Sequence, residues 1–500
     1  MKSGNAAGEK VKAKVYVLYT GGTIGMVPSD PDNPASPLKP ASKDDLVKHV
    51  PGIGTQTGIY WEIGGLVDDK GEPVPPLDSS DVNATHWTYV AAAIERVYND
   101  YDGFVILHGT DTMAYTASGL SFLLANLSKP VVITGSQLPI SSVRTDAVQN
   151  FVNAMYIAGY KATGLPLVPE VTICFGDSLL RGNRVRKVST SAWQGFTTPN
   201  FPKLGTVGEH IKINTEFIRP PANNQEAAFF AHKVLVTDVM DVGLFPGLKA
   251  SQLAKLLELP DLKGIVLRTF GAGNAPGYKD FLDVVAKAVE EEKVILNVTQ
   301  CLEGMVEMGL YEASSGLLER GVISGLDMTP EAALAKMMWI LATETGDEIK
   351  TQLQIDQRGE QSESLFDVSY GRHGTAGKPL GTVKASGRPS GQFRKAHLQR
   401  AVLRISGVGF AETELRNDIE LRVFINLPGA TGETPVDDPH CAVVFKQEYL
   451  GPDETTLMRD VTGTVRRVVE DGRPINIDLV PGGGKKIWCK GLYLALFARA

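Results

Sequence analysis

Cysteine is scarce in this 500-residue sequence, which has four: Cys174, Cys301, Cys441 and Cys489. They lie far apart and form no Cys-x-x-Cys pair, which excludes a dense disulfide framework and argues against a zinc site built on paired cysteines. We expect no metal and no cofactor. No stretch reaches 18 uninterrupted apolar residues, so no membrane span is expected. Residues 1–14 contain no apolar run of signal-peptide length, and a cytoplasmic location is therefore the expectation.

Charge is distributed unevenly along the chain, whose overall net charge is −7. Residues 375–500 contain 18 Lys and Arg against 14 Asp and Glu, a net of +4, whereas residues 1–374 have a net of −11. Eight basic residues fall between Gly371 and Arg404 without an acidic one. Because this run lacks the interleaved aromatic residues of a nucleic-acid groove, we interpret it as a solvated linker and expect no nucleic-acid partner.

Apolar strands alternate with helical segments through the first 350 residues. Strand-like runs include residues 15–19, 59–67, 104–107, 130–136 and 171–175. One helix is expected near residues 43–49. A second helix is expected to run to about residue 99, with Ser80 or Asp81 as its N-cap. A second series has strands at 233–237, 264–268 and 293–299 and a helix at 329–342. This alternation predicts an α/β fold with a doubly wound parallel sheet, in two α/β domains.

The last hundred residues have a different pattern, with short segments of period two and frequent turn residues. Residues 419–427, 457–469, 475–480 and 487–497 are interpreted as strands of an all-β sandwich of six to eight strands. The expected domains are an N-terminal α/β domain at 1–213, a linker at 214–232, a smaller α/β domain at 233–357, a basic linker at 358–396 and a β-sandwich at 397–500.

The first strand ends in polar residues that carry chemistry. Thr20 follows the apolar run directly, and Gly21 and Gly22 come next. Glycines permit unusual backbone angles and let a ligand approach, and the carboxyl end of a parallel strand is where α/β sheets bind ligands. We therefore interpret Thr20 as a candidate nucleophile. A plain strand-to-helix turn and a weak nucleotide loop are the alternatives, although the stretch fits neither phosphate-binding motif.

Two further polar turns follow predicted strands, at Ser79-Ser80 and at Thr110-Asp111. A threonine hydroxyl attacks only when a base takes its proton, and a lysine held by a carboxylate such as Asp111 is suited to that role. Taken singly, a Thr-Asp-Thr string after a strand is commonly only a helix cap. His108, at the same strand end, is interpreted as a hydrogen-bonded structural histidine in preference to a base.

Several of these strings resemble the signatures of a known family. Tyr19-Thr-Gly-Gly-Thr-Ile-Gly25 and Leu107-His-Gly-Thr-Asp-Thr-Met-Ala-Tyr115 resemble the two signature stretches of the bacterial-type L-asparaginases. Asp78-Ser-Ser-Asp81, Thr134-Gly-Ser-Gln137, Arg181-Gly-Asn183, Gly273-Asn-Ala-Pro276 and Thr299-Gln-Cys301 are most similar to the cytosolic type I branch. They occur in family order over residues 14 to about 355, roughly 70% of the chain.

The resemblance implies hydrolysis of L-asparagine to L-aspartate and ammonia through a threonine acyl-enzyme, with L-glutamine as a lesser substrate. It implies catalytic roles for Thr20, Thr110, Asp111 and Lys187. It further implies that the substrate's α-carboxylate and α-amino group are held by Ser79 and Ser80, and that Asp111 pairs with the α-ammonium. Gly22 and the backbone around Thr110 would lie near the oxyanion, where preorganised N–H groups are most effective.

The resemblance also implies a homodimer or homotetramer in which Asn274 contacts substrate across a subunit interface. One departure concerns the lid, where the family usually has a tyrosine: residues 27–59 contain none. Tyr311 is one candidate to replace it. The alternative function is therefore a catalytically weak asparaginase-like body that serves in binding or targeting together with its sandwich.

Overall fold

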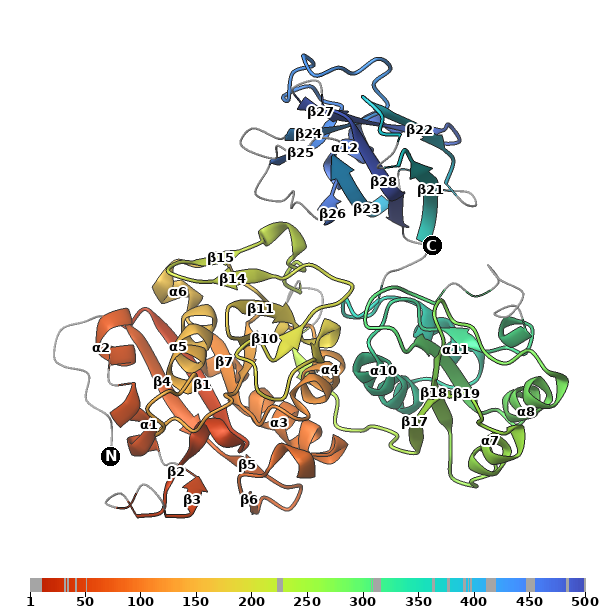
Figure 1. Ribbon diagram of the computed structural model, residues 1–500. Helices are drawn as coiled ribbons and strands as arrows, with labels where there is room; N and C mark the ends of the chain where they lie inside the picture. The colour runs from red at the N-terminus through yellow and green to blue at the C-terminus, as the bar shows by residue number, and fades with distance from the viewer. Residues whose placement is uncertain are drawn as a thin grey trace. The chain divides into compact units, whose positions relative to one another are not determined.

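The chain divides into two compact units, Met1–Gln361 and Ser362–Ala500 (Figure 1). The computed structural model describes residues 11–30, 33, 36–40, 43–50, 52–222, 228–306, 308, 316–361, 365–375, 378–389, 393, 395, 398–410, 420–446, 455–482 and 485–498. Across these ranges, none of the helices combines the length and the apolar character that crossing a membrane requires.

The N-terminal part of the first unit is built on an eight-stranded sheet with β1 (Ala13–Tyr19) between β4 (Ile59–Gly64) and β7 (Gly103–Leu107). These three strands run parallel, and Tyr19 pairs with Leu107 at their carboxyl ends. The sheet continues through β9 (Val131–Thr134) and β10 (Val171–Phe175), both parallel, and then through antiparallel β11 (Ser178–Arg181), β14 (Gly205–Val207) and β15 (Ile211–Ile213).

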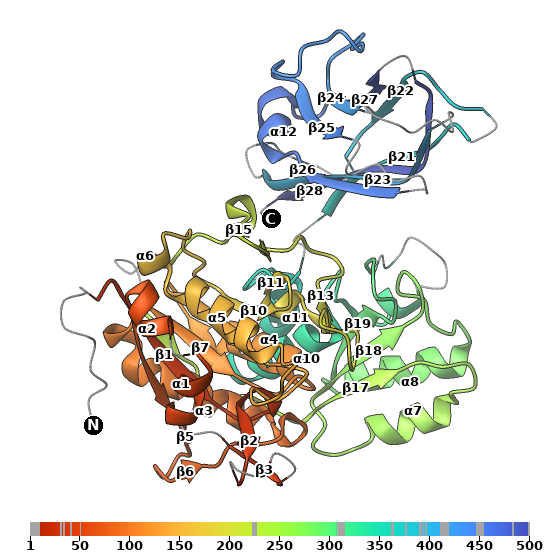
Figure 2. The ribbon, with the colours of Figure 1, turned by 60° about the vertical axis from the view of Figure 1, so that its left-hand side comes forward.

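Helices cover both faces of this sheet, so the predicted doubly wound architecture is confirmed (Figure 2). Alternating residues of β1 enter different cores: Leu18 joins the core of α3 (Ala84–Val97) and α4 (Met113–Leu123), whereas Val15 and Val17 join that of α5 (Ala147–Ala158). Because strand side chains alternate between faces, a strand buried on both sides is apolar at nearly every position.

The expected helix at residues 43–49 is present as α1 (Lys43–His49), but the expected cap of α3 is wrong. Asn83, and neither Ser80 nor Asp81, caps α3: its side chain accepts from the Thr85 N–H at 3.0 Å, while His86 Nδ1 accepts from the Asn83 N–H at 3.1 Å. The preceding residues Ser79–Asp81 instead form a separate 3-10 turn. That turn frees Ser79 for contacts at the end of the sheet.

The second α/β domain contains a four-stranded parallel sheet, β17 (Val239–Gly243), β18 (Gly264–Thr269), β19 (Val294–Thr299) and β20 (Ile323–Ser324), with helices α7 (Ala250–Leu257) and α8 (Lys279–Glu290). The first strand is β17, so the expected strand at 233–237 is wrong. Val236 donates its N–H to Met338 of α10 (Pro330–Thr343) at 2.9 Å, and Val234 is exposed, because that segment lies along a helix.

Helix α10 joins the two α/β domains into one core. Thr329 caps it, with its hydroxyl accepting from the Ala332 N–H at 3.1 Å, and Pro330 occupies its first turn. Its Trp339 stacks on Phe122 of α4 with ring centres 5.6 Å apart. Residues of both sheets consequently belong to a single apolar cluster.

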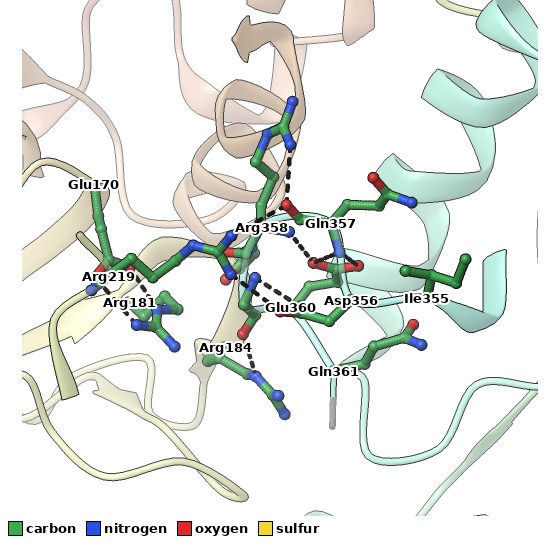
Figure 3. Close-up of polar contacts among 12 residues, drawn as sticks. Glu170, Arg181, Arg184, Arg219, Ile355, Asp356, Gln357, Arg358, Glu360 and Gln361 are labelled. Carbon is green, nitrogen blue, oxygen red and sulfur yellow. Dashed lines mark hydrogen bonds and ion pairs between the residues drawn. The ribbon is translucent and has the colours of Figure 1, made fainter. Parts of the chain in front are cut away.

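The first unit ends in a buried ion pair. Lys336 of α10 and Glu360 are both fully buried, with 2.7 Å between Nζ and Oε1. The Lys336 ammonium also donates to the carbonyls of Leu353 and Ile355. Figure 3 shows Asp356 and its neighbours in the chain beside Arg184 and Arg219 of the N-terminal domain: Arg184 donates to the Gly359 carbonyl, and Arg219 pairs with Asp356. The α/β unit therefore extends to residue 361, beyond the expected boundary at 357.

The second unit is a sandwich of two four-stranded sheets. One has the order β21 (Leu365–His373), β28 (Ile487–Ala498), β23 (Leu398–Phe410), β26 (Thr455–Asp460), and the other β22 (Val383–Gly387), β27 (Ile475–Pro481), β24 (Glu420–Ile425), β25 (Cys441–Lys446). The expected linker at 358–396 thus contains two sandwich strands, β21 and β22. Two of its basic residues, Arg372 and Lys384, are exposed positions on these strands, and Val383 and Ala385 on either side of Lys384 are buried.

The expected strand at 457–469 is only partly correct, because β26 ends at Asp460 and a helix, α12 (Thr462–Val468), follows. Val461, Val465 and Val469 are all buried in the sandwich core. Their spacing of four residues is the period of a helix face, which a search for alternation overlooks.

We predict that Glu360→Gln destabilises the protein by about 3–5 kcal/mol, because removal of one partner leaves the Lys336 charge buried without a counter-ion. The measurement is the free energy of unfolding by urea. Asp283→Asn is the matched control, since the Lys279–Asp283 pair has side chains 88% and 53% exposed and should change stability by less than about 1 kcal/mol. Equal effects of the two substitutions would contradict the role assigned to the buried pair.

We also predict that a chain ending at Gln361 folds with native secondary structure, whereas a chain ending at Gln357 is strongly destabilised. The shorter chain lacks Glu360 and leaves Lys336 without its ion-pair partner. Circular dichroism melts of the two chains provide the comparison. A melting temperature for 1–357 equal to that of 1–361 would show that the last four residues carry no stability.

Candidate active site

The predicted nucleophile lies at the end of β1 in a buried turn. Thr20 is 6% exposed, and both its N–H and its hydroxyl donate to the Leu107 carbonyl, at 3.1 and 2.9 Å. The Thr20 carbonyl accepts from the Leu77 N–H at 2.9 Å. The residue is thus fixed by neighbouring backbone from β7 and from the segment before Ser79. For the Thr20 oxygen to attack a substrate, the hydroxyl must first rotate away from the Leu107 carbonyl.

Glycines allow the turns to approach each other closely. Gly21 and Gly22 have φ of 124° and 82°, which side chains disfavour. A Cβ at Gly22 would lie 2.2 Å from the Gly109 nitrogen, and one at Gly21 would lie 2.0 Å from the Leu77 oxygen. The backbone turns at Gly22 and Gly109 are therefore in close contact. The Gly22 N–H already donates to the Leu77 carbonyl at 3.1 Å. Gly22 therefore contributes to the site by allowing close packing of the two turns.

The second cluster joins the end of β7 to a distant lysine. Lys187 Nζ donates to Thr110 Oγ1 at 2.9 Å and to Asp111 Oδ1 at 2.7 Å. The Lys187 side chain is 17% exposed and that of Asp111 is 64% exposed. Lys187 is positioned by the short ladder of β12 (Arg186–Lys187) with β13 (Phe196–Thr197). A carboxylate at the solvent edge thus orients an amine toward a less exposed hydroxyl.

Ser79 connects the remaining turn to this cluster. Its side chain is 3% exposed, and its Oγ accepts from the Asp111 N–H at 3.2 Å. The Thr112 hydroxyl donates to the Ser79 carbonyl at 2.6 Å. Thr112 was not among the residues predicted from the sequence, although it is the last residue of the His-Gly-Thr-Asp-Thr string that contains Thr110 and Asp111. The structure therefore brings Thr20, Gly22, Ser79, Thr110, Asp111 and Lys187 to one edge of the sheet.

Two predicted substrate contacts lie outside this cluster. Ser80 is exposed, and its hydroxyl donates to Asp78 Oδ1 at 2.8 Å. Hydrogen bonds from the Ser80 backbone and side chain lower the pKa of Asp78. Asn274 belongs to a turn of the second α/β domain, where its N–H donates to the Phe270 carbonyl at 2.8 Å. Its side-chain oxygen is buried and has no hydrogen-bond donor among the described residues.

His108 is a structural residue, as predicted. It is 1% exposed, with Nδ1 2.6 Å from the Gly109 carbonyl and Nε2 2.9 Å from Thr116 Oγ1. Burial lowers the pKa of His108 to about 4. The imidazole is therefore neutral near pH 7, and both of its nitrogens are engaged in holding the turn that carries Thr110.

The segment after Thr20 forms a hairpin of β2 (Met26–Pro28) and β3 (Leu38–Pro40). The Tyr19 hydroxyl donates to the Gly25 carbonyl at 2.9 Å, and a Cβ at Gly25 would lie 2.4 Å from the Tyr19 ring. Tyr19 thereby anchors the base of this hairpin. Tyr311, the candidate replacement for the lid tyrosine, lies outside the described residues.

We predict that His108 makes the protein less stable in acid. Its folded-state pKa of about 4 lies below the ordinary value of 6.5, so the unfolded chain binds the proton more readily. Stability is then lost as the pH falls from about 6.5 toward 4, and this one group should account for about 2 kcal/mol between pH 7 and pH 5.

The measurement is urea unfolding of the parent protein and of His108→Asn at both pH values. The variant should lose stability overall but show a smaller difference between pH 7 and pH 5. Substitution of exposed His210 by Gln is the control and should leave the difference unchanged. An unchanged difference in His108→Asn would contradict the neutral, buried imidazole.

Comparisons with known proteins match both α/β domains. The model for "Asparaginase, N-terminal" matches residues 14–219, and that for "Glutaminase/Asparaginase C-terminal domain" matches residues 238–353. L-asparaginase 1 of Escherichia coli (strain K12) is 40% identical over 355 residues, which is 70% of this chain and 98% of that protein. The 60 kDa lysophospholipase of Mus musculus is 35% identical over 446 residues, 85% of this chain and 76% of that protein.

Solved structures agree with these matches. L-asparaginase I from Vibrio cholerae superimposes with a TM-score of 0.61 at 36% identity, covering 70% of this chain and 99% of that one. The thermostable L-asparaginase from Thermococcus kodakarensis gives a TM-score of 0.62 at 32% identity, covering 70% of this chain and 100% of that one. The described sandwich strands begin at Leu365, beyond both matched family models.

Proposed function

The chain belongs to the asparaginase family, and from this premise we propose that it hydrolyses L-asparagine to L-aspartate and ammonia, with L-glutamine as a lesser substrate. The observation that carries the proposal is the Lys187–Thr110–Asp111 cluster beside the buried Thr20 turn. Relatives named L-asparaginase support the choice of substrate. A hydroxyl nucleophile and a lysine-assisted hydroxyl are the groups that an acyl transfer requires.

The first proposed step is attack of the Thr20 oxygen on the side-chain amide carbon of asparagine. The new C–O bond gives a tetrahedral intermediate, whose collapse breaks the C–N bond and leaves an aspartyl ester on Thr20. The hydroxyl proton passes to the leaving nitrogen, which departs as ammonia. The proposed oxyanion donors are backbone N–H groups of the turn around Thr110, since the Thr20 and Gly22 N–H groups already donate to the Leu107 and Leu77 carbonyls.

The second proposed step is hydrolysis of that ester. As water attacks the ester carbon, its proton passes to the Thr110 oxygen and the Thr110 proton passes to the Lys187 amine, whose nitrogen lies 2.9 Å away. Asp111 orients the amine and stabilises it once it is charged. Breaking the C–O bond of the ester releases aspartate, and the proton that returns from Lys187 through Thr110 restores the Thr20 hydroxyl.

Substrate recognition is proposed to use Ser79 for the α-carboxylate and Asp111 for the α-ammonium. The exposed Asp111 carboxylate leaves one oxygen for this contact while the other bonds Lys187. Ser80 joins them only if it turns from Asp78. We further propose that Asn274, from a second copy of the chain in a homodimer or homotetramer, completes the site, because its buried oxygen lacks a donor among the described residues.

We predict that Thr20→Ala and Lys187→Ala each reduce ammonia release from asparagine by at least about 10³-fold, because each removes a group that acts on reacting atoms. The measurement is steady-state ammonia release by purified full-length protein. Lys203→Ala is the matched control: its amine is exposed and pairs only loosely with Asp177 at 3.5 Å, and its activity should stay near that of the parent. Undiminished rates in both active-site variants would refute the mechanism.

The second candidate function is binding or targeting by a catalytically weak body. The observation that favours it is the absence of tyrosine from residues 27–59. A panel of asparagine, glutamine and small amides, tested on the full chain and on residues 1–361, distinguishes the two functions. Turnover of asparagine by both chains supports the enzyme, and failure to turn over any amide supports the binding role.

A further inference from the structure

A second polar cavity lies within the first unit, away from the catalytic cluster. Its volume is about 220 Å³, and its walls include Ser121, Leu124, Glu170, Arg181, Arg219 and Arg358. Ser121 and Leu124 lie at the carboxyl end of α4, whose other end follows Asp111 and Thr112. An eleven-residue helix is about 16 Å long, so the cavity and the catalytic cluster are separate sites.

The lining has more positive than negative charge. Its one carboxylate, Glu170, is occupied by Arg181, whose Nε and a terminal nitrogen donate at 2.5 and 3.1 Å, and by the backbone N–H of Arg219 at 2.7 Å. The Arg219 guanidinium in turn pairs with Asp356 at 3.0 Å. Figure 3 shows Glu170, Arg181 and Arg219 gathered beside the segment that carries Asp356 and Arg358.

Burial lowers the pKa of the Arg358 guanidinium, and the nearby Glu360 and Asp356 carboxylates act in the opposite direction. In the described parts of the chain Arg358 forms no salt bridge, and its buried Nε has no hydrogen-bond acceptor. One terminal nitrogen donates to the Gln357 carbonyl at 2.9 Å, and the guanidinium carbon lies 5.5 Å from the centre of the Trp339 ring. Because this Nε has almost no accessible surface, a ligand in the cavity would meet the terminal nitrogens of the guanidinium, and their positive charge favours an anion.

We propose that this cavity binds a small carboxylate-bearing anion on Arg358. The planar guanidinium matches a carboxylate in geometry and charge. The cavity volume of about 220 Å³ is large enough for a small dicarboxylate. Leu124 and the half-buried Leu127 provide apolar contacts for its methylene groups, while Arg219 adds positive potential.

The experiment is calorimetric titration of the full-length protein with succinate and, separately, with inorganic phosphate. Succinate should bind, and Arg358→Gln should weaken binding by at least about tenfold through loss of a charge-assisted contact. Arg358→Lys should retain part of the affinity because the charge remains. Arg320→Gln is the matched control, since Arg320 pairs only with its neighbour Glu319, and it should bind like the parent.

Trp339 provides a local readout, because a ligand on Arg358 should change its fluorescence, and Trp339→Phe should abolish that change. Ala222→Glu, which places a competing carboxylate at a partly exposed wall, should also prevent binding and covers the case in which Arg358→Gln fails to fold. Absence of succinate binding up to roughly 50 mM, equal binding to the parent and Arg358→Gln, or binding of phosphate alone would each overturn the proposal.

Discussion

The candidate site depends on close contact between two backbone turns, at Gly22 and Gly109. A Cβ at Gly22 would lie 2.4 Å from the Gly109 Cα, so any side chain there would force apart the ends of β1 and β7. Those ends carry Thr20 and Thr110. The Leu107 carbonyl accepts both the Thr20 N–H and its hydroxyl, which fixes the nucleophile relative to the strand that leads to Thr110 and Asp111. Glycine is thus required here by space as well as by its positive φ.

Much of this site could be predicted from the sequence because strand ends are local features. Thr20, Ser79 and Thr110 each lie in a polar turn that follows a predicted strand, and parallel strands bring such turns to one edge of a sheet. The position of Lys187 could not be predicted from the residues alone, since it depends on the ladder of β12 with β13, and only the family resemblance identified it. The outward direction of Ser80 depends on a bond to Asp78 that competes with any substrate contact.

The parts of the fold that differ from the sequence-based expectation are those whose structure depends on contacts with residues far away in the sequence. Residues 233–237 have the composition of a strand, but their backbone bonds to α10, because β17 occupies the edge of the sheet. The basic stretch after Gly371 has the composition of a linker, yet buried Val383 and Ala385 alternate with exposed residues on β22, which pairs with β27 in the sandwich. Glu360 is separated from Lys336 by 24 positions, and no local pattern indicates that both are buried.

The segment 356–361 connects the end of the α/β unit with the chain that leads to Lys187. Asn183 Nδ2 donates to the Arg358 carbonyl at 3.0 Å, and Arg184 Nε donates to the Gly359 carbonyl at 2.6 Å. These two residues lie only three and four positions before the lysine. The Lys336–Glu360 pair holds the same segment from the side of α10. All of these contacts lie within the first unit, so the segment that follows α10 and α11 (Asp347–Gln354) supports the chain just before Lys187.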